Sequence, residues 1–425
     1  MEISLIIPAL NDAHLLAKQI SALEKQSLLP NQVIIADSSG NDDIKLLSIK
    51  GSSKFELTYL RCGREHRFDR FFQTLMSFFY RFRRNNEPHN AFKNECKKYP
   101  AEAINIAANH AKYEILAFLD LGTEPALTWL EDYYGLMILK KYEVIFGSTK
   151  YSSNTAFQKA IHRSTFGNNP LESNPGTLIL KEIYFDNKIL NGYRAGADLE
   201  WRKRIKQSCK WFYPSKTYLT YNSLPKNFFE AAKKFFIYQL HGSMIRIQEN
   251  VKDFVLSAFL VLMSFLVIKW NSFFDWNTQS FFYIPHITKI FLLTVFFFSI
   301  QFLILKRLNF FSESKSYRIS SGLVKFLILI FFFLVSFRWN SIAANWVESS
   351  ILYIPHITKI YFFTLVFSLI LYRGVIFPLK NGFTKNDLNT INAINAGVVG
   401  TMLDIVKVPG FLLGSILYIF IKRHD

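Results

Sequence analysis

The chain has 425 residues, which exceeds one ordinary domain, and its 44 phenylalanines are concentrated in the second half. Lysine and arginine outnumber aspartate and glutamate by 50 to 32, which gives a net charge of +18. This charge suits nucleic acid, anionic lipid or phosphorylated ligands, and the long apolar segments favour lipid over nucleic acid. The three cysteines have no metal-binding or redox spacing, and their odd number argues against a disulfide framework.

The first residues lack the basic region and cleavage site of a signal peptide, so we expect the first part of the chain to stay in the cytoplasm. Residues 3–8, ISLIIP, predict a buried strand, and an amphipathic helix follows. A second predicted strand at 33–36 ends on the acidic loop DSSGNDD. Strand, helix, strand and polar loop form a βαβ unit, which binds nucleotides in many folds. No G-x-G-x-x-G follows the first strand, which disfavours a dinucleotide site.

Residues 62–98 are an insertion that a minimal domain of this kind does not need. Within it, RFDRFFQTLMSFFYRFRR at 67–84 has aromatic residues at three- and four-residue spacings and arginines at both ends. The pattern predicts a basic amphipathic helix, which either lies on an anionic bilayer or packs on the domain itself.

The stretch 115–129, ILAFLDLGTEPALTW, predicts a buried strand that delivers one acid, Asp120, to its carboxyl end. A second acid, Asp198, follows Gly196 in GYRAGADLEWRKRI and begins a basic helical segment. Asp198 is either a general base or an ordinary helix cap.

Five blocks in this order, ISLIIPALND, VIIADSSGNDD, YPAEAINIAANHA, ILAFLDLGTEP and RAGADLEWRKR, resemble family 2 glycosyltransferases of the GT-A fold. The resemblance covers residues 1–240 and implies an α/β fold with a mixed, mostly parallel sheet and flanking helices. It also implies a nucleotide-sugar donor. The residues implied in donor binding are Pro8, Ala9, Asn11, Asp37, Ser39, Asp42, Asn105 and Asp120.

The resemblance assigns Asp198 as the general base and Asp120 as the ligand of a divalent cation, Mg²⁺ or Mn²⁺. Arg194, Trp201 and Arg204 are expected to form the acceptor site or to bind its phosphate. Three positions depart from the family pattern, each losing a polar side chain: Gly122 replaces the second acid of D-x-D, Ile104 the Arg of A-R-N, and Ala197 the Glu of E-D.

Residues 250–375 predict four transmembrane helices, at 254–268, 287–305, 323–337 and 357–371. The octapeptide YIPHITKI at 283–290 recurs at 353–360, and each copy is preceded by Trp-Asn-Ser, so the four helices are expected to be two parallel tandem repeats. The basic loops place both ends of this region in the cytoplasm. The Trp-Asn-Ser segments then face outward. Residues 380–425 predict interfacial or re-entrant helices.

These features predict an inverting glycosyltransferase of the inner or plasma membrane, with a cytoplasmic catalytic domain. Its donor would be a nucleotide-diphosphate sugar and its acceptor lipid-linked or a surface polysaccharide. Two alternatives remain, a polyisoprenyl-phosphate glycosyltransferase and a catalytically silent membrane subunit with the same fold. No Q-x-x-R-W follows Asp198, which disfavours a processive polymer synthase.

Overall fold

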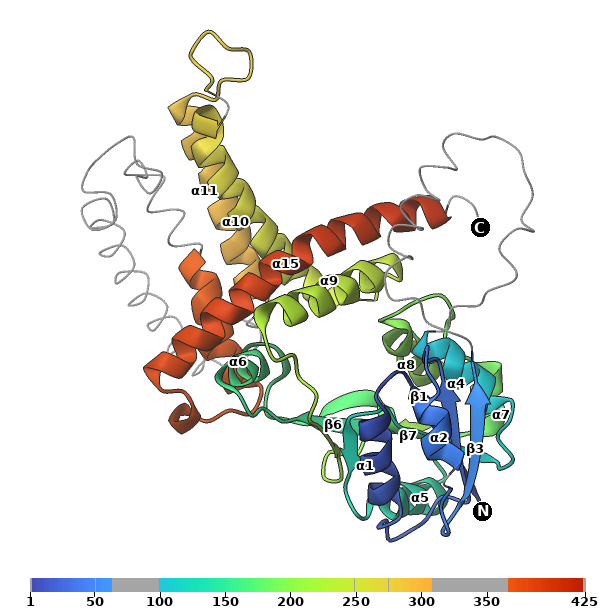
Figure 1. Cartoon of the computed structure of the whole chain (residues 1–425). Helices are drawn as coiled ribbons and strands as arrows, with labels where there is room; N and C mark the ends of the chain where they lie inside the picture. Colours follow the sequence, from blue (N-terminus) through green and yellow to red (C-terminus); the bar gives the residue numbers. More distant parts are fainter. Residues whose placement is uncertain are drawn as a thin grey trace, which may run out of the picture. The chain divides into compact units, whose positions relative to one another are not determined.

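The computed structural model describes residues 2–49, 51–62, 99–247, 249–273, 275–307 and 366–422 (Figure 1). Internal contacts divide the chain into two units. The first contains Met1–Asn154 and Asn168–Pro225, and the second contains Thr155–Gly167 and Lys226–Asp425. The predicted basic helix at 67–84, the third predicted span and the second YIPHITKI copy lie outside the described residues.

The described part of the first unit contains one mixed sheet of nine strands in the order β3-β2-β1-β4-β7-β6-β9-β5, with β8 paired to β6. Five of its eight strand pairings are parallel. The predicted mixed α/β sheet with flanking helices is confirmed. The strands are β1 Ile3–Ala9, β2 Gln32–Asp37, β3 Glu56–Arg61, β4 Ile115–Phe118, β5 Thr123–Pro125, β6 Val144–Tyr151, β7 Leu171–Leu180, β8 Trp211–Phe212 and β9 Leu219–Tyr221.

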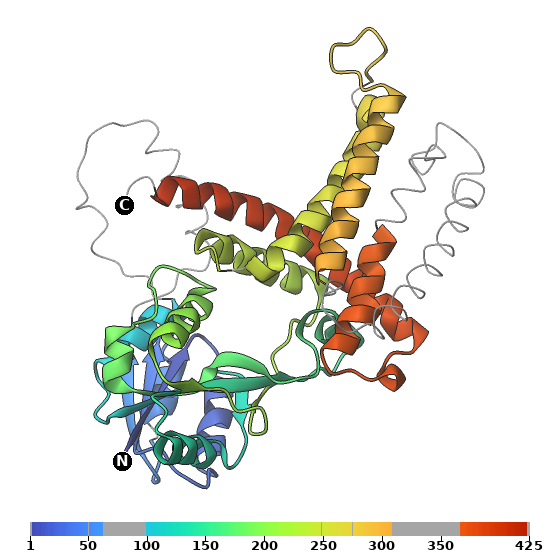
Figure 2. The same ribbon diagram turned by 180° about the vertical axis from the view of Figure 1, so that it is seen from behind.

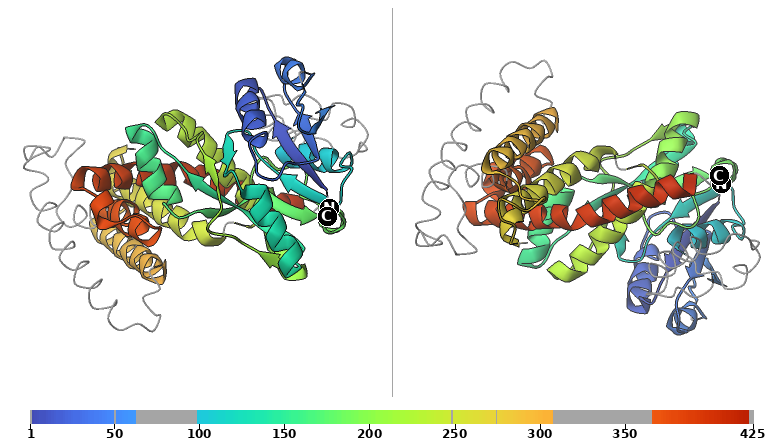
Figure 3. Two further views of the ribbon diagram at one scale, coloured as in Figure 1. Left: turned by 90° about the horizontal axis from the view of Figure 1, so that it is seen from below. Right: turned by 90° about the horizontal axis from the view of Figure 1, so that it is seen from above.

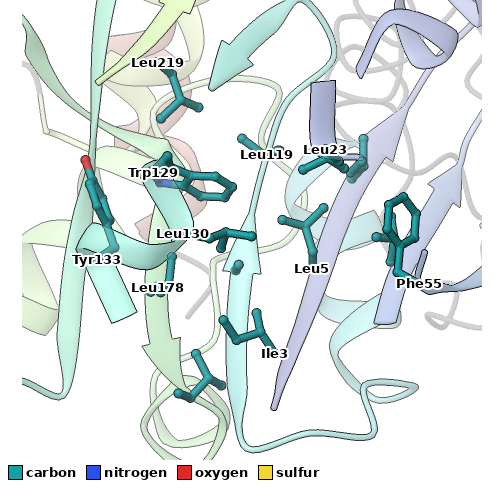
Figure 4. Packing of buried hydrophobic residues seen from close by; sticks show 14 of the residues in the cluster. Ile3, Leu5, Leu23, Phe55, Leu119, Trp129, Leu130, Tyr133, Leu178 and Leu219 are labelled. Atoms are coloured by element: carbon teal, nitrogen blue, oxygen red, sulfur yellow. The ribbon is translucent and has the colours of Figure 1, made fainter. Parts of the chain in front are cut away.

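Helices cover both faces of the sheet, and the side chains of β1 divide between them with a period of two. Ile3, Leu5 and Ile7 face a core that includes Trp129 and Leu130 of α5 (Figure 4). Ile6 faces the opposite core, against α4 and α8. The helices of this unit are α1 Ala13–Leu23, α2 Asp43–Ile49, α4 Pro100–Ala108, α5 Trp129–Lys140, α7 Lys181–Asp186 and α8 Ala197–Ser208.

Strand β1 lies between β2 and β4, and all three are parallel. The chain therefore leaves β1 toward one neighbour and later reaches the other, which makes the carboxyl end of β1 a topological switch point. The loops after β1, β2 and β4 begin at this edge of the sheet. Ligands of open α/β sheets bind at such edges.

The described residues of the second unit form helices. They are α6 Ala156–Ile161, the π-helix η1 His162–Phe166, α9 Phe228–Met244, α10 Glu249–Phe273, α11 His286–Arg307, the π-helix η2 Tyr372–Ile376, α14 Phe377–Lys380, η3 Lys385–Asp387 and α15 Thr390–Lys422. The first unit ends at Pro225, and α9 packs on α15 in the second unit. Beyond η3 the described chain forms one helix, α15, which contains Pro409. The expected boundary at residue 240 and the interfacial or re-entrant placement of residues 380–425 stay predictions.

Helices α9 and α15 lie side by side (Figures 2 and 3). Glycines of α15 allow the two backbones to approach closely. A Cβ on Gly410 would lie 2.7 Å from the Phe236 carbonyl oxygen, and a Cβ on Gly414 would lie 2.2 Å from that of Leu240. This packing holds α15 continuous although Pro409 removes one backbone hydrogen bond. Of the described helices, one segment, Thr390–Tyr418, meets length and hydropathy criteria for crossing a membrane, and half of its most apolar window is buried.

Arg373, Asp404 and Lys407 form a buried ion cluster in the second unit. The Arg373 guanidinium donates to both oxygens of Asp404 at 2.6 Å, and the Lys407 ammonium donates to Asp404 Oδ1 at 2.9 Å. Arg373 also donates to the Ser164 carbonyl of η1 at 3.0 Å. The cluster therefore joins η1, η2 and α15. Breaking such a buried pair leaves an uncompensated charge, which is strongly destabilising.

Helices α10 and α11 form a hairpin whose tip is ordered by the first Trp-Asn-Ser copy (Figure 1). The Asn271 side chain donates to the Ile284 carbonyl at 2.9 Å and accepts from the Ile284 N–H at 3.0 Å. The Trp270 indole N–H donates to the Phe282 carbonyl at 2.8 Å. In this copy, the residues of the sequence motif close the turn of the hairpin.

Replacing Gly414 by alanine is expected to destabilise the second unit by about 1–3 kcal/mol, because the new methyl group would overlap backbone atoms of α9. Gly135→Ala is the matched control: Gly135 lies in α5 and its Cβ would meet nothing within 4 Å. The control is expected to stabilise by about 0.5–1 kcal/mol, since alanine favours helix. Thermal unfolding of the full chain in detergent measures both. Equal midpoints for the two variants would contradict the packing described.

Candidate functional site

The loops after β1 and β2 are tied together by Asn11. The Asn11 N–H donates to Ser39 Oγ at 2.7 Å, and Asn11 Oδ1 accepts from the Gly40 N–H at 3.3 Å. Asn11 has φ +57°, a conformation that asparagine tolerates better than most residues. Pro8 and Ala9 end β1 opposite Ala36 and Asp37 of β2. The structure therefore brings together the first four predicted donor-site residues and Ser39.

Asp37 is fully buried, and both of its carboxylate oxygens accept hydrogen bonds. The Ser39 N–H donates to Oδ1 at 2.8 Å, and the Tyr59 hydroxyl donates to Oδ2 at 2.8 Å. Arg61 bridges Asp37 and Asp42, at 3.2 and 3.1 Å. Burial raises the pKa of the Tyr59 phenol, and the neighbouring Asp37 carboxylate raises it further. Tyr59 and Arg61 end β3, and no motif in the sequence points to them.

Asp120 follows β4 and is partly exposed. Its backbone carbonyl accepts from the Thr123 hydroxyl at 2.6 Å and from the Gln19 side-chain amide at 3.2 Å. These bonds fix the turn that carries the carboxylate. Among the described residues, no group of three or more His, Cys, Asp and Glu side chains is arranged to hold a metal ion.

Gly122 has φ +86°, and a Cβ there would lie 2.7 Å from Ser223 Oγ. An L-residue at this position is strained by its backbone and by this contact. The turn therefore favours glycine at position 122. Ile104 and Ala197, the other two departures, are buried in the apolar core beside Ile6 and Phe118. An arginine or glutamate there would be a buried charge.

Tyr151 and Tyr221 end β6 and β9, lie opposite each other in register, and have ring centroids 5.4 Å apart. Burial raises the pKa of both phenols, that of Tyr221 to about 12 with Asp120 and Asp12 contributing. The carboxylates of Asp198 and Asp120 both raise the pKa of Tyr151 further. Tyr151 thus interacts electrostatically with both Asp198, the predicted general base, and Asp120, the predicted metal ligand. Both tyrosines stay neutral at physiological pH and remain hydrogen-bond donors.

Asp198 is the second residue of α8, after Gly196 with φ +86°. Its side chain is 42% exposed, and the Arg202 guanidinium lies 3.6 Å from its carboxylate. The helix N-terminus favours negative charge at this position. Arg194 is partly exposed in the loop that leads to α8.

The polar groups of three other predicted site residues are engaged within the fold. Asn105 donates to the Ile189 carbonyl and to Asn191, at 2.8 and 2.7 Å, and accepts from the Tyr184 hydroxyl. Trp201 is fully buried and donates its indole N–H to the Asn187 carbonyl. Arg204 pairs with Glu200 at 2.6 Å and donates to the Lys188 carbonyl. Asn105 and Trp201 are therefore hydrogen-bonded to the segment 187–191.

Gly122→Asp is expected to lower the stability of the first unit by about 1–3 kcal/mol, because φ would remain positive in a non-glycine residue. Gly122→Ala made in a Ser223→Ala background removes the hydroxyl contact and isolates the backbone strain. We expect most of the loss to persist there, as measured by the thermal midpoint. Full recovery in that background would show that the contact, and not φ, excludes larger residues.

No protein-family model matches the chain, and no curated protein matches its sequence. Solved structures that it resembles include S. aureus TarS, with a TM-score of 0.36 and 15% identity over 71% of this chain and 49% of that chain. The match thus spans about half of the TarS chain. Another is the mannosyltransferase PcManGT of Pyrobaculum calidifontis in complex with GDP-Man and Mn²⁺, with a TM-score of 0.38 and 12% identity over 86% of each chain. A third is glucosyl-3-phosphoglycerate synthase of Mycobacterium tuberculosis with Mn²⁺ and UDP, with a TM-score of 0.34 and 13% identity over 53% of this chain and 73% of that chain.

Proposed function

We propose that the chain is an inverting, membrane-bound glycosyltransferase that uses a nucleotide-diphosphate sugar. The observation that carries the proposal is the set of polar groups at the carboxyl edge of the sheet, where Asn11 ties the loops after β1 and β2 together and Asp120 follows β4, together with Asp198 at the start of α8. One acid follows a parallel strand and the other begins a helix. A sugar-transfer site needs this separation of roles, with one group for the leaving diphosphate and another for the acceptor hydroxyl.

In the proposed reaction, the acceptor hydroxyl oxygen attacks the anomeric carbon of the donor. The bond from that carbon to the diphosphate oxygen breaks, and the diphosphate leaves with the electron pair. Asp198 takes the proton of the acceptor hydroxyl. Attack from the face opposite the leaving group inverts the anomeric configuration in a single displacement, so no covalent enzyme intermediate is needed.

The base and ribose would lie on the loops after β1 and β2, with Pro8, Ala9 and Asn11 along one side. Asp37 holds Tyr59 and Arg61, so in this proposal it shapes the nucleoside site together with Ser39 and Asp42. Asn105 supports the segment 189–191, ahead of Arg194 and Asp198.

Asp120 is the residue proposed to hold a divalent cation, Mg²⁺ or Mn²⁺. A lone carboxylate suits a hard cation that also takes phosphate oxygens and water as ligands, which is the common arrangement for Mg²⁺ with nucleotides. The cation would neutralise charge on the leaving diphosphate. Because Gly122 leaves no place for a second acid, cation binding is expected to depend on the nucleotide.

The membrane part of the proposal is supported by the second unit. Helices α10 and α11 have 25 and 22 residues, and each contains a shorter apolar segment, Ser257–Phe273 and Thr288–Phe297. The hairpin tip carries Trp270, Trp276 and Phe281, and the Phe281 side chain is 93% exposed. Tryptophan is enriched at membrane interfaces. The acceptor is proposed to be lipid-linked or a surface polysaccharide at the cytoplasmic leaflet, with a polyisoprenyl phosphate as the alternative.

The active-site proposal predicts separate defects for the two acids. Asp198→Asn is expected to lower sugar transfer by about 10²–10⁴-fold while donor binding persists, because a general base is lost. Asp120→Asn is expected to weaken Mn²⁺-dependent donor binding.

A thermal-shift screen with UDP, GDP, CDP and dTDP sugars, with and without Mn²⁺, identifies the donor, and a transfer assay follows. Glu56→Gln, at the opposite edge of the sheet, is the control. A screen without any shift would favour the catalytically silent subunit.

The proposed topology predicts that the hairpin tip and the first unit lie on opposite sides of the membrane. With the native cysteines replaced, Asp275→Cys at the tip is expected to react with a membrane-impermeant maleimide only from outside. Lys216→Cys, exposed in the first unit, is expected to react only from the cytoplasmic side. Right-side-out and inside-out vesicles provide the comparison. Labelling of both positions from one side of sealed vesicles would exclude a hairpin that crosses the bilayer.

A further inference from the structure

A row of alternating charges runs along α8 from the proposed base. Asp198, Arg202 and Lys206 are spaced four residues apart and lie on one face of the helix, and Glu172 of β7 lies between the two cations. Arg202 is 3.6 Å from the Asp198 carboxylate and 3.2 Å from that of Glu172. Lys206 is 2.7 Å from Glu172. We call these four residues the charge ladder.

Arg202 is the buried member of the charge ladder. Its side chain is 9% exposed, against 42% for Asp198. One guanidinium nitrogen donates to both the backbone carbonyl and the carboxylate of Glu172, while the Asp198 carboxylate lies near the other terminal nitrogen. One terminal nitrogen of the guanidinium is therefore bound to Glu172 of β7, and the other faces the Asp198 carboxylate. Water and salt weaken a charge–charge interaction less when one of the two partners is buried.

Lys206 ends the charge ladder against aromatic rings. Its ammonium lies 4.6 Å from the ring centroid of Trp211 and 5.5 Å from that of Phe146. Glu172 is therefore shared between two cations, of which Lys206 is restrained by packing. Because Glu172 pairs with both cations, a stronger contact with Lys206 means that Glu172 neutralises less of the Arg202 charge, which then acts more strongly on Asp198.

We propose that Arg202 is a positioning residue for Asp198, and that Glu172 sets how strongly Arg202 acts on it. The inference rests on the proposed function, in which Asp198 is the general base. Arg202 would fix the direction of the carboxylate that accepts the acceptor's proton. Glu172 opposes this by neutralising part of the guanidinium charge.

Tyr151 interacts electrostatically with Asp198, and the same phenol interacts with Tyr221 and Asp120. Tyr151 ends β6, Tyr221 ends β9, and Asp120 follows β4. Arg194 lies in the preceding loop, and Glu200 on α8 pairs with Arg204. The phenols are neutral and Asp120 is an acid, whereas the Arg202 guanidinium brings a positive charge to 3.6 Å from the Asp198 carboxylate.

The proposal predicts opposite shifts of the acidic limb of the pH profile of kcat/KM, which reports the base of the free enzyme. Arg202→Gln is expected to move this limb to higher pH, because a nearby cation is lost. Glu172→Gln is expected to move it to lower pH, because the Arg202 charge is then no longer neutralised by a carboxylate at position 172. Arg202→Lys keeps the charge but loses the planar fork, so kcat should fall while the limb moves little.

A second measurement does not need activity. A carbodiimide reacts with protonated carboxyl groups, so the pH dependence of Asp198 labelling, followed by mass spectrometry of the full chain, reports the protonation of that carboxylate. We expect the labelling curve to move upward in pH in Arg202→Gln and downward in Glu172→Gln. Lys112→Gln breaks an ion pair at the far edge of the sheet and is the matched control, expected to leave the curve unchanged.

The outcomes separate the two proposals. Shifts in the same direction for Arg202→Gln and Glu172→Gln, or none in either, would overturn the role of the charge ladder, even if both variants lose stability. Opposite labelling shifts in a chain that shows no sugar transfer would support the charge ladder and contradict the proposed function.

Discussion

The burial of the parallel strands on both faces is the constraint on which the rest of the first unit depends. Strands β1, β2 and β4 are enclosed by two apolar cores, so their side chains are almost entirely hydrophobic up to the last residue. Polar groups can then gather only where the strands end. Asp37 and Asp120 lie at or just after such ends, and Asn11 joins two of the loops that follow. The position of the candidate site is therefore a consequence of how the core is built.

The same packing disfavours charged side chains at positions 104, 122 and 197. Ile104 and Ala197 belong to the core under α4 and α8, and Gly122 is held by its positive φ and by Ser223. None of these positions accommodates a charge without strain or burial cost. The charges around the candidate site come instead from other elements: Arg61 ends β3, Arg202 lies on α8, and Glu172 lies on β7. We infer that the chain distributes its electrostatic contacts differently from the pattern that its sequence blocks resemble.

The second unit follows other rules, because its helices pack through small residues and one buried ion cluster. Gly410 and Gly414 let α15 contact the backbone of α9, whereas Arg373 and Asp404 connect η2, α15 and η1. The segment that contains η1 joins β6 to β7, so it is continuous in sequence with the strands that carry Tyr151 and Glu172. Arg373 therefore binds a segment that is joined covalently to β6 at one end and to β7 at the other.

The sequence by itself determined the first strand–helix–strand unit, the strand that ends before Asp120 and the acids at these strand ends, because these depend on local periodicity and on turn residues. It did not determine which polar side chains meet. Tyr59, Tyr151, Tyr221 and Glu172 lie far apart in the chain, and no spacing marks them, whereas Arg202 follows Asp198 by one helical turn. Trp201 and Asn105 resembled site residues in sequence, and their indole and amide groups are bonded within the fold. Only the tertiary structure decided these roles, because sheet register and helix packing select the face on which each side chain lies.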